Sequence, residues 1–293
     1  MQHWYLMSNC SRSMPDMPQL PPGELIFRQV ADALAEDIGD GDLTAELVPE
    51  KALDRATILA REPGVLAGSA WVDAIFYELG REVEIEWLAR DGDRLVEDQP
   101  ICYLAGPSRV LLSGERTALN FLQTLSGTAT TVASYVDAVA GTGVRILDTR
   151  KTIPGLRLAQ KYAVLCGGGA NHRIGLYDAI LIKENHIAAA GSIHSVMERS
   201  NSFDVEVEIE VETLEQLEEA LDADAKRVLL DNFSIEMLKQ AVELNARRAR
   251  LEVSGNVTLE TIRELAETGI DDISIGALTK HVRALDLSML FED

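Results

Sequence analysis

The chain has 293 residues, of which 46% are hydrophobic, and a formal net charge of −21 at pH 7. It is therefore long enough for two domains, or for one large barrel with an appendage, and can bury a sizeable core. The negative charge argues against a nucleic-acid partner, and no apolar run reaches the roughly 20 residues that span a bilayer. The three cysteines follow no disulfide or zinc pattern, so we expect a cytoplasmic protein in which Cys166 is a packed thiol.

Residues 1–22 differ in composition from the rest of the chain. Met, Ser, Pro and Gln predominate, and four prolines between residues 15 and 22 disfavour a helix. The segment lacks the basic start and the continuous apolar core of a signal peptide. We expect it to be a disordered extension that precedes the fold.

The next hundred residues carry a mixture of helix and strand patterns. Helices are predicted over 25–37 and 68–79, and strands over 56–60, 83–88 and 99–104. Residues 38–44 predict a capped turn and not a calcium loop, because their carboxylate spacing does not match an EF-hand. These patterns favour a sandwich of helices and strands.

A long helical pattern follows, from Ser113 to Val139, and it carries Arg116. The small residues Ser126-Gly127-Thr128 predict a break within it, because glycine weakens a helix interior. We therefore expect two helices in this stretch.

Strand and helix patterns then alternate, which predicts a parallel sheet with helices on its outer face. The strands are predicted over 144–148, 178–182, 205–211, 227–231, 250–253 and 272–275, and the helices near 155–166, 192–200, 213–221, 234–246 and 258–267. Six strands are few for a closed barrel of eight, even with one more that the patterns do not place. We therefore expect a partly open α/β barrel.

Polar side chains follow the predicted strands, at the end where a parallel barrel carries its catalytic groups. They are Arg150, Lys151, Lys183, Glu210, Asp231, Ser254-Gly255-Asn256 and Ser274-Ile275-Gly276. His172 and Arg173 lie between the first two strands, and residues 145–183 hold seven Lys or Arg against two acids. A cationic mouth in so acidic a protein predicts a small polyanionic substrate.

Two kinds of ligand group stand out at this mouth. Glu210 and Asp231 are carboxylates of the kind that bind Mg²⁺ together with substrate phosphates. The two Ser/Gly loops follow the last two strands, where barrels bind phosphate through backbone N–H groups. We expect one magnesium site and one phosphate site.

Each candidate also has a plainer interpretation. Arg150 and Lys151 are alternatively solvated strand ends, His172 a helix-end residue, and the two carboxylates charge partners of the arginines. Lys183 leaves a core strand and is alternatively a Schiff-base lysine, as in aldolases. His194 and His281 have no convergent partners, so we interpret both as structural.

Several motifs together resemble the quinolinate phosphoribosyltransferase family. They are Asp148-Thr149-Arg150-Lys151-Thr152, Asn171-His172-Arg173, Lys183-Glu184-Asn185-His186, Val207-Glu208-Ile209-Glu210-Val211, Leu229-Leu230-Asp231-Asn232 and the helix motif over 113–120. The resemblance extends from about residue 25 to the C-terminus. It implies an α/β sandwich domain over 23–128, on which 281–293 pack, and an open-faced parallel α/β barrel of about seven strands over 129–280. It also implies a homodimer.

The resemblance further implies an activity. Quinolinate and phosphoribosyl pyrophosphate, with Mg²⁺, would give nicotinate mononucleotide, pyrophosphate and CO₂ in NAD biosynthesis. Quinolinate is a dicarboxylate, which arginine binds through paired N–H donors.

The implied roles divide the mouth among the parts of the two substrates. Quinolinate would be bound by Arg150, His172, Arg173 and Lys183, with Arg116 reaching in from the partner subunit. Lys151 faces the pyrophosphate, and Glu210 and Asp231 hold the metal and the ribose hydroxyls. Ser254, Gly255, Asn256, Ser274 and Gly276 bind the 5′-phosphate, although Asn256 stands where a second glycine is common.

Three alternatives remain at this point. A related transferase acting on nicotinate would need fewer cations, because nicotinate has one carboxylate. A lipoyl-like carrier is suggested by the Gly-Asp turn at 91–93, but no lysine sits at a hairpin tip for modification. A Schiff-base aldolase would use Lys183.

Overall fold

The computed structural model describes residues 18–292. The expected disorder of residues 1–22 therefore falls mainly outside the described residues. Residues 18–22 have no regular structure and lead into helix α1 (Gly23–Ile38). Within the described residues, no helix combines the length and the apolar character needed to cross a membrane.

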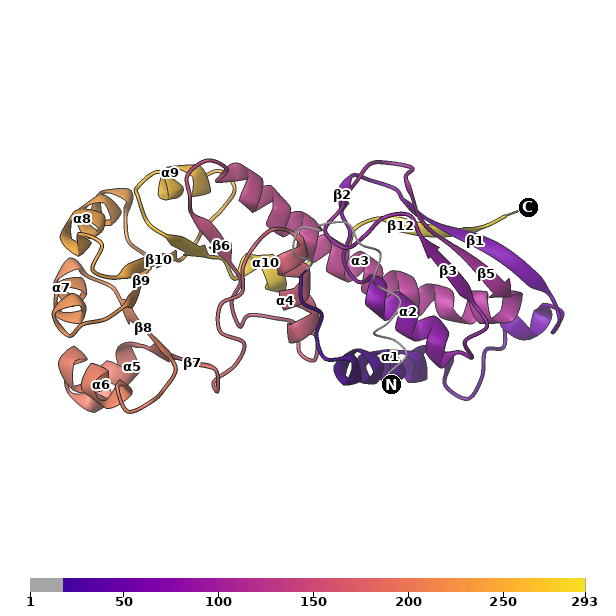
Figure 1. Cartoon of the computed structure of the whole chain (residues 1–293), viewed down its shortest axis with the longest axis horizontal. Helices are drawn as coiled ribbons and strands as arrows, with labels where there is room; N and C mark the ends of the chain where they lie inside the picture. Colours follow the sequence, from indigo (N-terminus) through magenta and orange to yellow (C-terminus); the bar gives the residue numbers. More distant parts are fainter. Residues whose placement is uncertain (1–17, 293) are drawn as a thin grey trace, which may run out of the picture.

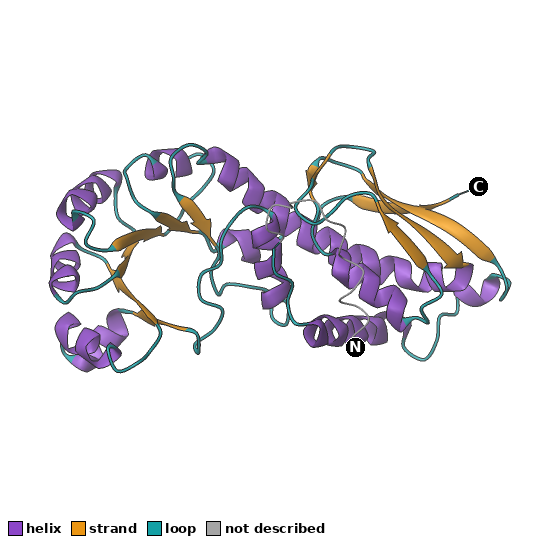
Figure 2. Cartoon of the chain, viewed as in Figure 1, coloured by secondary structure: helices purple, strands orange, loops and turns teal. Residues whose placement is uncertain are grey.

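An antiparallel sheet with helices on one face forms the first half of the fold (Figures 1 and 2). Its four strands lie in the order β12-β1-β5-β3. The strands are β1 (Leu53–Ala60), β3 (Glu84–Trp87), β5 (Pro100–Pro107) and β12 (Leu287–Phe291), and β2 (Gly64–Val65) pairs with β4 (Arg94–Leu95). Helices α1, α2 (Ser69–Glu78) and α3 (Ser108–Ala138) pack here, with a short 3-10 helix, η2 (Ala45–Leu47). Because β12 pairs with β1, the end of the chain returns to the first sheet.

The alternation of buried and less buried residues along each strand explains why the helices cover only one face of the sheet. In β1, Ala56, Ile58 and Ala60 are buried and contribute to the core, whereas Leu53 is exposed. Alternate residues of a strand point to opposite faces, so one face packs on the helices and the other meets solvent. The predicted capped turn is also present, since the Asp42 carboxylate accepts hydrogen bonds from the amides of Thr44 and Ala45.

Helix α3 is continuous, so the predicted break at residues 126–128 is wrong. Its small residues instead allow neighbouring segments to approach closely. The Ser126 hydroxyl bonds both backbone groups of Ala67, and a Cβ on Gly127 would lie 2.1 Å from the carbonyl oxygen of Arg283. Tertiary packing therefore decides the conformation here, against local helix propensity.

The second half of the chain forms a six-stranded parallel sheet in the order β6-β11-β10-β9-β8-β7. Its strands are β6 (Arg145–Leu147), β7 (Ala179–Ile182), β8 (Glu206–Val211), β9 (Arg227–Asp231), β10 (Arg250–Ser254) and β11 (Asp272–Ser274). All six lie where the sequence predicts them. Figure 1 shows the strands curving into an arc that is open between β6 and β7.

Helices cover the outer side of this arc (Figure 2). They are α5 (Glu184–Ala190), α6 (Ile193–Ser200), α7 (Leu214–Asp222), α8 (Ile235–Asn245) and α9 (Ile262–Ala266), while α4 (Arg157–Cys166) and α10 (Ala277–Lys280) lie toward the first domain. Helix α5 is an addition to the helices that the sequence predicts. Cys166 in α4 is a buried free thiol, as expected, and burial raises its pKa.

A single bridge stands where the barrel would need its second strand. Ala170 pairs with Leu147 in a parallel bridge, and its amide donates to the carbonyl of Ile146 at 2.8 Å. The chain then leaves the sheet. The seventh strand implied by the family resemblance is thus reduced to one bridge, and the segment after Ala170 is free to carry side chains into the barrel.

We predict that Gly127→Ala lowers the free energy of unfolding by about 1–3 kcal/mol, because the added methyl group overlaps the backbone of Arg283. Urea denaturation measures the difference. The control is Gly23→Ala at the start of α1, where a Cβ meets nothing within 4 Å, and its effect should stay within about 0.5 kcal/mol. Equal stability of the two variants would contradict the close approach.

Candidate active site

The barrel interior is built in layers of alternating strand residues. On β8, Glu206, Glu208 and Glu210 share one face because a strand has a period of two. The lowest layer is held by ion pairs, in which Asp272 accepts from Arg145 at 2.8 Å and from Arg250 at 2.9 Å. Arg145 is therefore part of the barrel floor and does not contribute to the cationic mouth.

A buried carboxylate, Asp148, organises the residues directly after β6. It pairs with Lys161, whose side chain is only 2% exposed, and it accepts from Asn171 Nδ2 at 2.7 Å and from the amide of His172 at 2.9 Å. Lys161 also donates to the carbonyl of His172 at 2.9 Å. This network holds the segment after Ala170 against β6 and α4, and it positions His172.

Of the seven basic residues counted between 145 and 183, three therefore lie away from the mouth. Arg145 and Lys161 belong to the buried ion pairs, and Arg157 donates to the carbonyl of Ile174 at 3.2 Å. Spacing along the sequence does not show which cations are already paired.

The remaining four cations line one cavity of 330 Å³ in the mouth of the barrel. Its lining residues are Thr149, Arg150, Lys151, His172, Arg173, Leu181, Lys183, Glu210, Leu229, Glu252, Ser254 and Ser274. We call it the upper cavity. Arg150 Nε is buried there without a hydrogen-bond partner among the described residues. A buried guanidinium N–H without an acceptor is costly, so this cavity is suited to an anionic ligand.

Lys183 and Glu210 form an ion pair across the upper cavity. The lysine is predicted to bind the substrate and the carboxylate to bind a metal ion, whereas the structure pairs the two side chains with each other. An anion and a cation arriving together would exchange this pair for two ligand contacts without leaving either charge unpaired.

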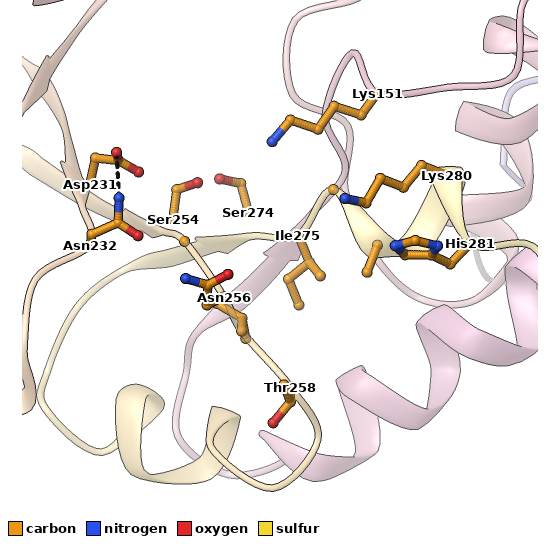
Figure 3. A pocket seen from close by; sticks show the side chains of 14 residues that line it. Lys151, Asp231, Asn232, Ser254, Asn256, Thr258, Ser274, Ile275, Lys280 and His281 are labelled. Atoms are coloured by element: carbon orange, nitrogen blue, oxygen red, sulfur yellow. Dashed lines mark hydrogen bonds between the residues drawn. The ribbon is translucent and has the colours of Figure 1, made fainter.

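A second cavity of 530 Å³ adjoins the first (Figure 3). The two share Lys151, Ser254 and Ser274, so they form one continuous site. We call the second one the loop cavity, because Gly255, Asn256 and Gly276 lie along it with Asp231.

Backbone geometry explains the glycine positions of the loop cavity. A Cβ on Gly255 would lie 2.2 Å from Asn232 Oδ1, and one on Gly276 would lie 2.7 Å from Lys151 Cδ. Asn256 has φ 46°, a left-handed conformation that asparagine tolerates better than most residues. The asparagine is therefore compatible with a position where glycine is common.

Lys280 and His281 also line the loop cavity, and sequence reasoning missed both. Figure 3 shows the Lys280 and Lys151 side chains extending toward the same space beside Ser274. His281 was interpreted as structural, but its ring lies beside this space. The two residues follow the end of β11 by six and seven positions, so nothing in the local pattern marks them.

His172 and Glu252 line the upper cavity, and together with Glu208 they form what we call the floor cluster. Its Nε2 lies 2.7 Å from Glu208 Oε2 and 3.5 Å from Glu252 Oε1, and its Nδ1 accepts from the amide of Arg173 at 2.7 Å. Burial would lower the pKa of His172, but the hydrogen bond to Glu208 and the two carboxylate charges outweigh burial and raise it. Because the Arg173 amide occupies Nδ1, the ring proton is on Nε2 and points at Glu208.

This floor cluster has the composition of a metal site, with three ligand atoms within 4.8 Å of one another. However, Arg227 Nη2 lies 3.0 Å from Glu252 Oε2, and Arg227 Nε lies 3.6 Å from Glu208 Oε1. The guanidinium already supplies the positive charge that a cation would bring. Glu208 and Glu252 were not singled out by sequence reasoning, although the alternation of β8 places Glu208 on the same face as Glu210.

Arg116 lies elsewhere. It is exposed on α3, in the part of the helix that packs in the first domain, and no hydrogen bond or ion pair joins it to another described residue. The structure therefore places every predicted substrate residue around the two cavities except Arg116.

The fold and the site define an α/β-barrel enzyme with a cationic mouth for anionic substrates. The family model "Quinolinate phosphoribosyl transferase, C-terminal domain" matches residues 128–290, and the N-terminal domain model matches residues 42–126. The chain belongs to the quinolinate phosphoribosyltransferase family.

Individual relatives agree with this assignment. The probable nicotinate-nucleotide pyrophosphorylase [carboxylating] of Bacillus subtilis is 42% identical over 87% of this chain and 89% of its own length. The chloroplastic nicotinate-nucleotide pyrophosphorylase [carboxylating] of Arabidopsis thaliana is 40% identical over 88% of this chain and 80% of its own. The solved nicotinate-nucleotide pyrophosphorylase of Francisella tularensis is 44% identical, with a TM-score of 0.92, over 95% of this chain and 100% of its own.

We predict that Lys161→Met lowers the free energy of unfolding by about 3–5 kcal/mol, because it leaves the Asp148 carboxylate buried without its charge partner. Chemical denaturation at pH 7 tests this. The matched control is Lys226→Met, which breaks an exposed ion pair with Asp224 and should cost under about 1 kcal/mol. Similar losses in both variants would show that burial does not govern the Asp148 pair.

Proposed function

We propose that this chain transfers the phosphoribosyl group of phosphoribosyl pyrophosphate to quinolinate, with decarboxylation to nicotinate mononucleotide, in NAD biosynthesis. The observation that supports this most directly is the joining of two anion-binding cavities through Lys151, Ser254 and Ser274. One cavity suits a dicarboxylate and the other a sugar phosphate.

The upper cavity is proposed to bind quinolinate. Arg150, Arg173 and Lys183 line it, and two carboxylates would satisfy two arginines through paired N–H donors. The buried Arg150 Nε is an unfilled donor of the kind that such a ligand needs. Nicotinate, with one carboxylate, would leave one of these cations unpaired and is therefore the weaker candidate.

The loop cavity is proposed to bind phosphoribosyl pyrophosphate. The serine hydroxyls and the backbone around Gly255 and Gly276 would take the 5′-phosphate, and Lys151, at the junction of the cavities, would face the pyrophosphate. Lys280 adds a positive charge on the same side. The anomeric carbon would then lie at the junction, next to the quinolinate nitrogen.

Glu210 and Asp231 border this junction and are proposed to hold Mg²⁺. Carboxylate oxygens next to a pyrophosphate site fit that ion. When bound, Mg²⁺ would neutralise charge that develops on the departing pyrophosphate. The carboxylates would also stabilise the oxocarbenium-like character of the anomeric carbon, as in glycoside chemistry.

The protein is also proposed to be a cytoplasmic homodimer. The reason for the homodimer is an active site that two subunits share. Arg116 is exposed on α3 and has no partner among the described residues, while the upper cavity is built to neutralise two carboxylates. Donation of Arg116 by a second copy would add a cation to that cavity.

We predict turnover with quinolinate, phosphoribosyl pyrophosphate and Mg²⁺, and none with nicotinate in place of quinolinate, because nicotinate leaves part of the clamp unpaired. Formation of nicotinate mononucleotide and release of CO₂ are followed together. A chelator should stop the reaction, and added Mg²⁺ should restore it. Turnover with nicotinate alone would contradict the dicarboxylate assignment, and activity unchanged by the chelator would contradict the metal.

A shared site also predicts complementation between two inactive variants. Arg116→Ala and Lys183→Ala should each fold and lose most activity, since each removes one cation of the quinolinate clamp. Mixing them in equal amounts should restore up to about a quarter of the wild-type activity. Random exchange makes about half of the dimers hybrids, and each hybrid has one intact site out of two. No recovery despite subunit exchange, confirmed by mass spectrometry, would contradict donation of Arg116.

A further inference from the structure

Glu252 is a buried acid of the floor cluster that lines the upper cavity and has no role in the proposed function. It lies in the middle of β10, its side chain is 1% exposed, and it lines the same cavity as Arg150 and Lys183. Its Oε1 has no hydrogen-bond partner among the described residues. An unpartnered buried carboxyl oxygen is costly and is often linked to function.

The groups around Glu252 leave it short of positive charge. Glu208 on β8 and Glu252 share the single guanidinium of Arg227 on β9, at 3.6 and 3.0 Å. On β11, Asp272 lies 3.6 Å from the same guanidinium but is satisfied by Arg145 and Arg250.

His172, on the segment after α4, offsets this deficit only in part. Its Nε2 lies 3.5 Å from Glu252 Oε1, and its charge and that of Arg227 lower the pKa of Glu252. Burial first, and then the charge of Glu208, raise the pKa of Glu252 to about 7. Ser274 on β11 also bonds Glu252 and opposes this rise. Part of the molecules therefore carry Glu252 as a protonated carboxylic acid near neutral pH.

The proposed reaction needs one proton at this place. Once the ring nitrogen of quinolinate has bonded to the ribose, it carries a positive charge. The bond between C2 and its carboxylate then breaks, CO₂ leaves, and the electron pair stays on C2, stabilised by the adjacent cationic nitrogen. That carbon must gain a proton to give nicotinate mononucleotide.

We propose that Glu252 is the acid that protonates C2 after CO₂ has left. Its O–H bond breaks, the proton bonds to the electron pair on C2, and Glu252 becomes a carboxylate held by Arg227. Water that enters after product release returns the proton. This inference rests on the proposed quinolinate site.

Other groups around the upper cavity are less suited to this step. Lys183 is paired with Glu210, and guanidinium groups such as those of Arg150 and Arg173 hold their protons too strongly. Both nitrogens of His172 are engaged, with Glu208 and with the Arg173 amide. Glu252, in contrast, lines this cavity, and its Oε1 makes no hydrogen bond to a described residue.

The test compares Glu252→Gln with Glu252→Asp in the quinolinate assay. The glutamine keeps the shape and cannot donate, so kcat should fall by about 100-fold or more, with KM values within about threefold of wild type. The aspartate keeps the acid and should retain more activity than the glutamine. In the wild type, kcat should fall as pH rises through the pKa of Glu252, because only the protonated form donates, and this limb should be absent from the glutamine variant.

The control is Glu206→Gln, which removes a carboxylate one layer lower that also pairs with Arg227, at 3.6 Å. It should keep kcat and the pH profile of the wild type. Quinolinate binding and a melting curve establish that each variant is folded.

A kcat for Glu252→Gln within twofold of wild type, or the same pH limb in both proteins, would overturn the proposal. If the glutamine variant does not fold, then an aspartate variant with wild-type KM and an unchanged pH limb would overturn it instead. Absence of any wild-type turnover with quinolinate would contradict the proposed function, which is a separate outcome.

Discussion

The buried ion pair between Asp148 and Lys161 is the constraint on which the active site depends. Both side chains are almost fully buried, and a buried charge without a partner is costly. Asp148 therefore uses its other lone pairs on Asn171 and on the amide of His172, and Lys161 holds the carbonyl of His172. A segment that makes only one strand bridge is held in place by these contacts, so His172 and Arg173 enter the barrel where a second strand would otherwise exclude them.

The lower layers of the barrel are held by ion pairs, whereas the top layer lines the candidate active site. At the bottom, Asp272 is satisfied by Arg145 and Arg250, which closes the lowest layer with ion pairs. In the middle, two glutamates share one guanidinium and leave two carboxyl oxygens without partners. At the top, the cations outnumber the acids and line two joined cavities. The excess of positive charge in the mouth is what anionic substrates would neutralise.

The six parallel strands were predictable because each is a short apolar run followed by charged or small residues, and the same feature indicated the mouth. The error at α3 has a clear cause, because Ser126 and Gly127 weaken a helix locally but permit the approach of Ala67 and Arg283. Counting Arg145 and Lys161 among the cations of the mouth was an error with a different cause. Their carboxylate partners lie on β11 and at the end of β6, and a charge count along the sequence does not reveal this pairing.

The amino-acid sequence by itself determined the type of each major element, the order of strands and helices, the family resemblance and most of the residues of the mouth. These follow from local periodicity and from motifs that are contiguous in the chain. Only the tertiary structure decided which charges are neutralised, that the seventh strand shrinks to a bridge at Ala170, and that Lys280, His281 and the Glu208–Glu252 pair belong to the site. These properties depend on distances between strands that are remote in sequence, and on the energetic cost of burying charge, which is set by the environment and not by the residue.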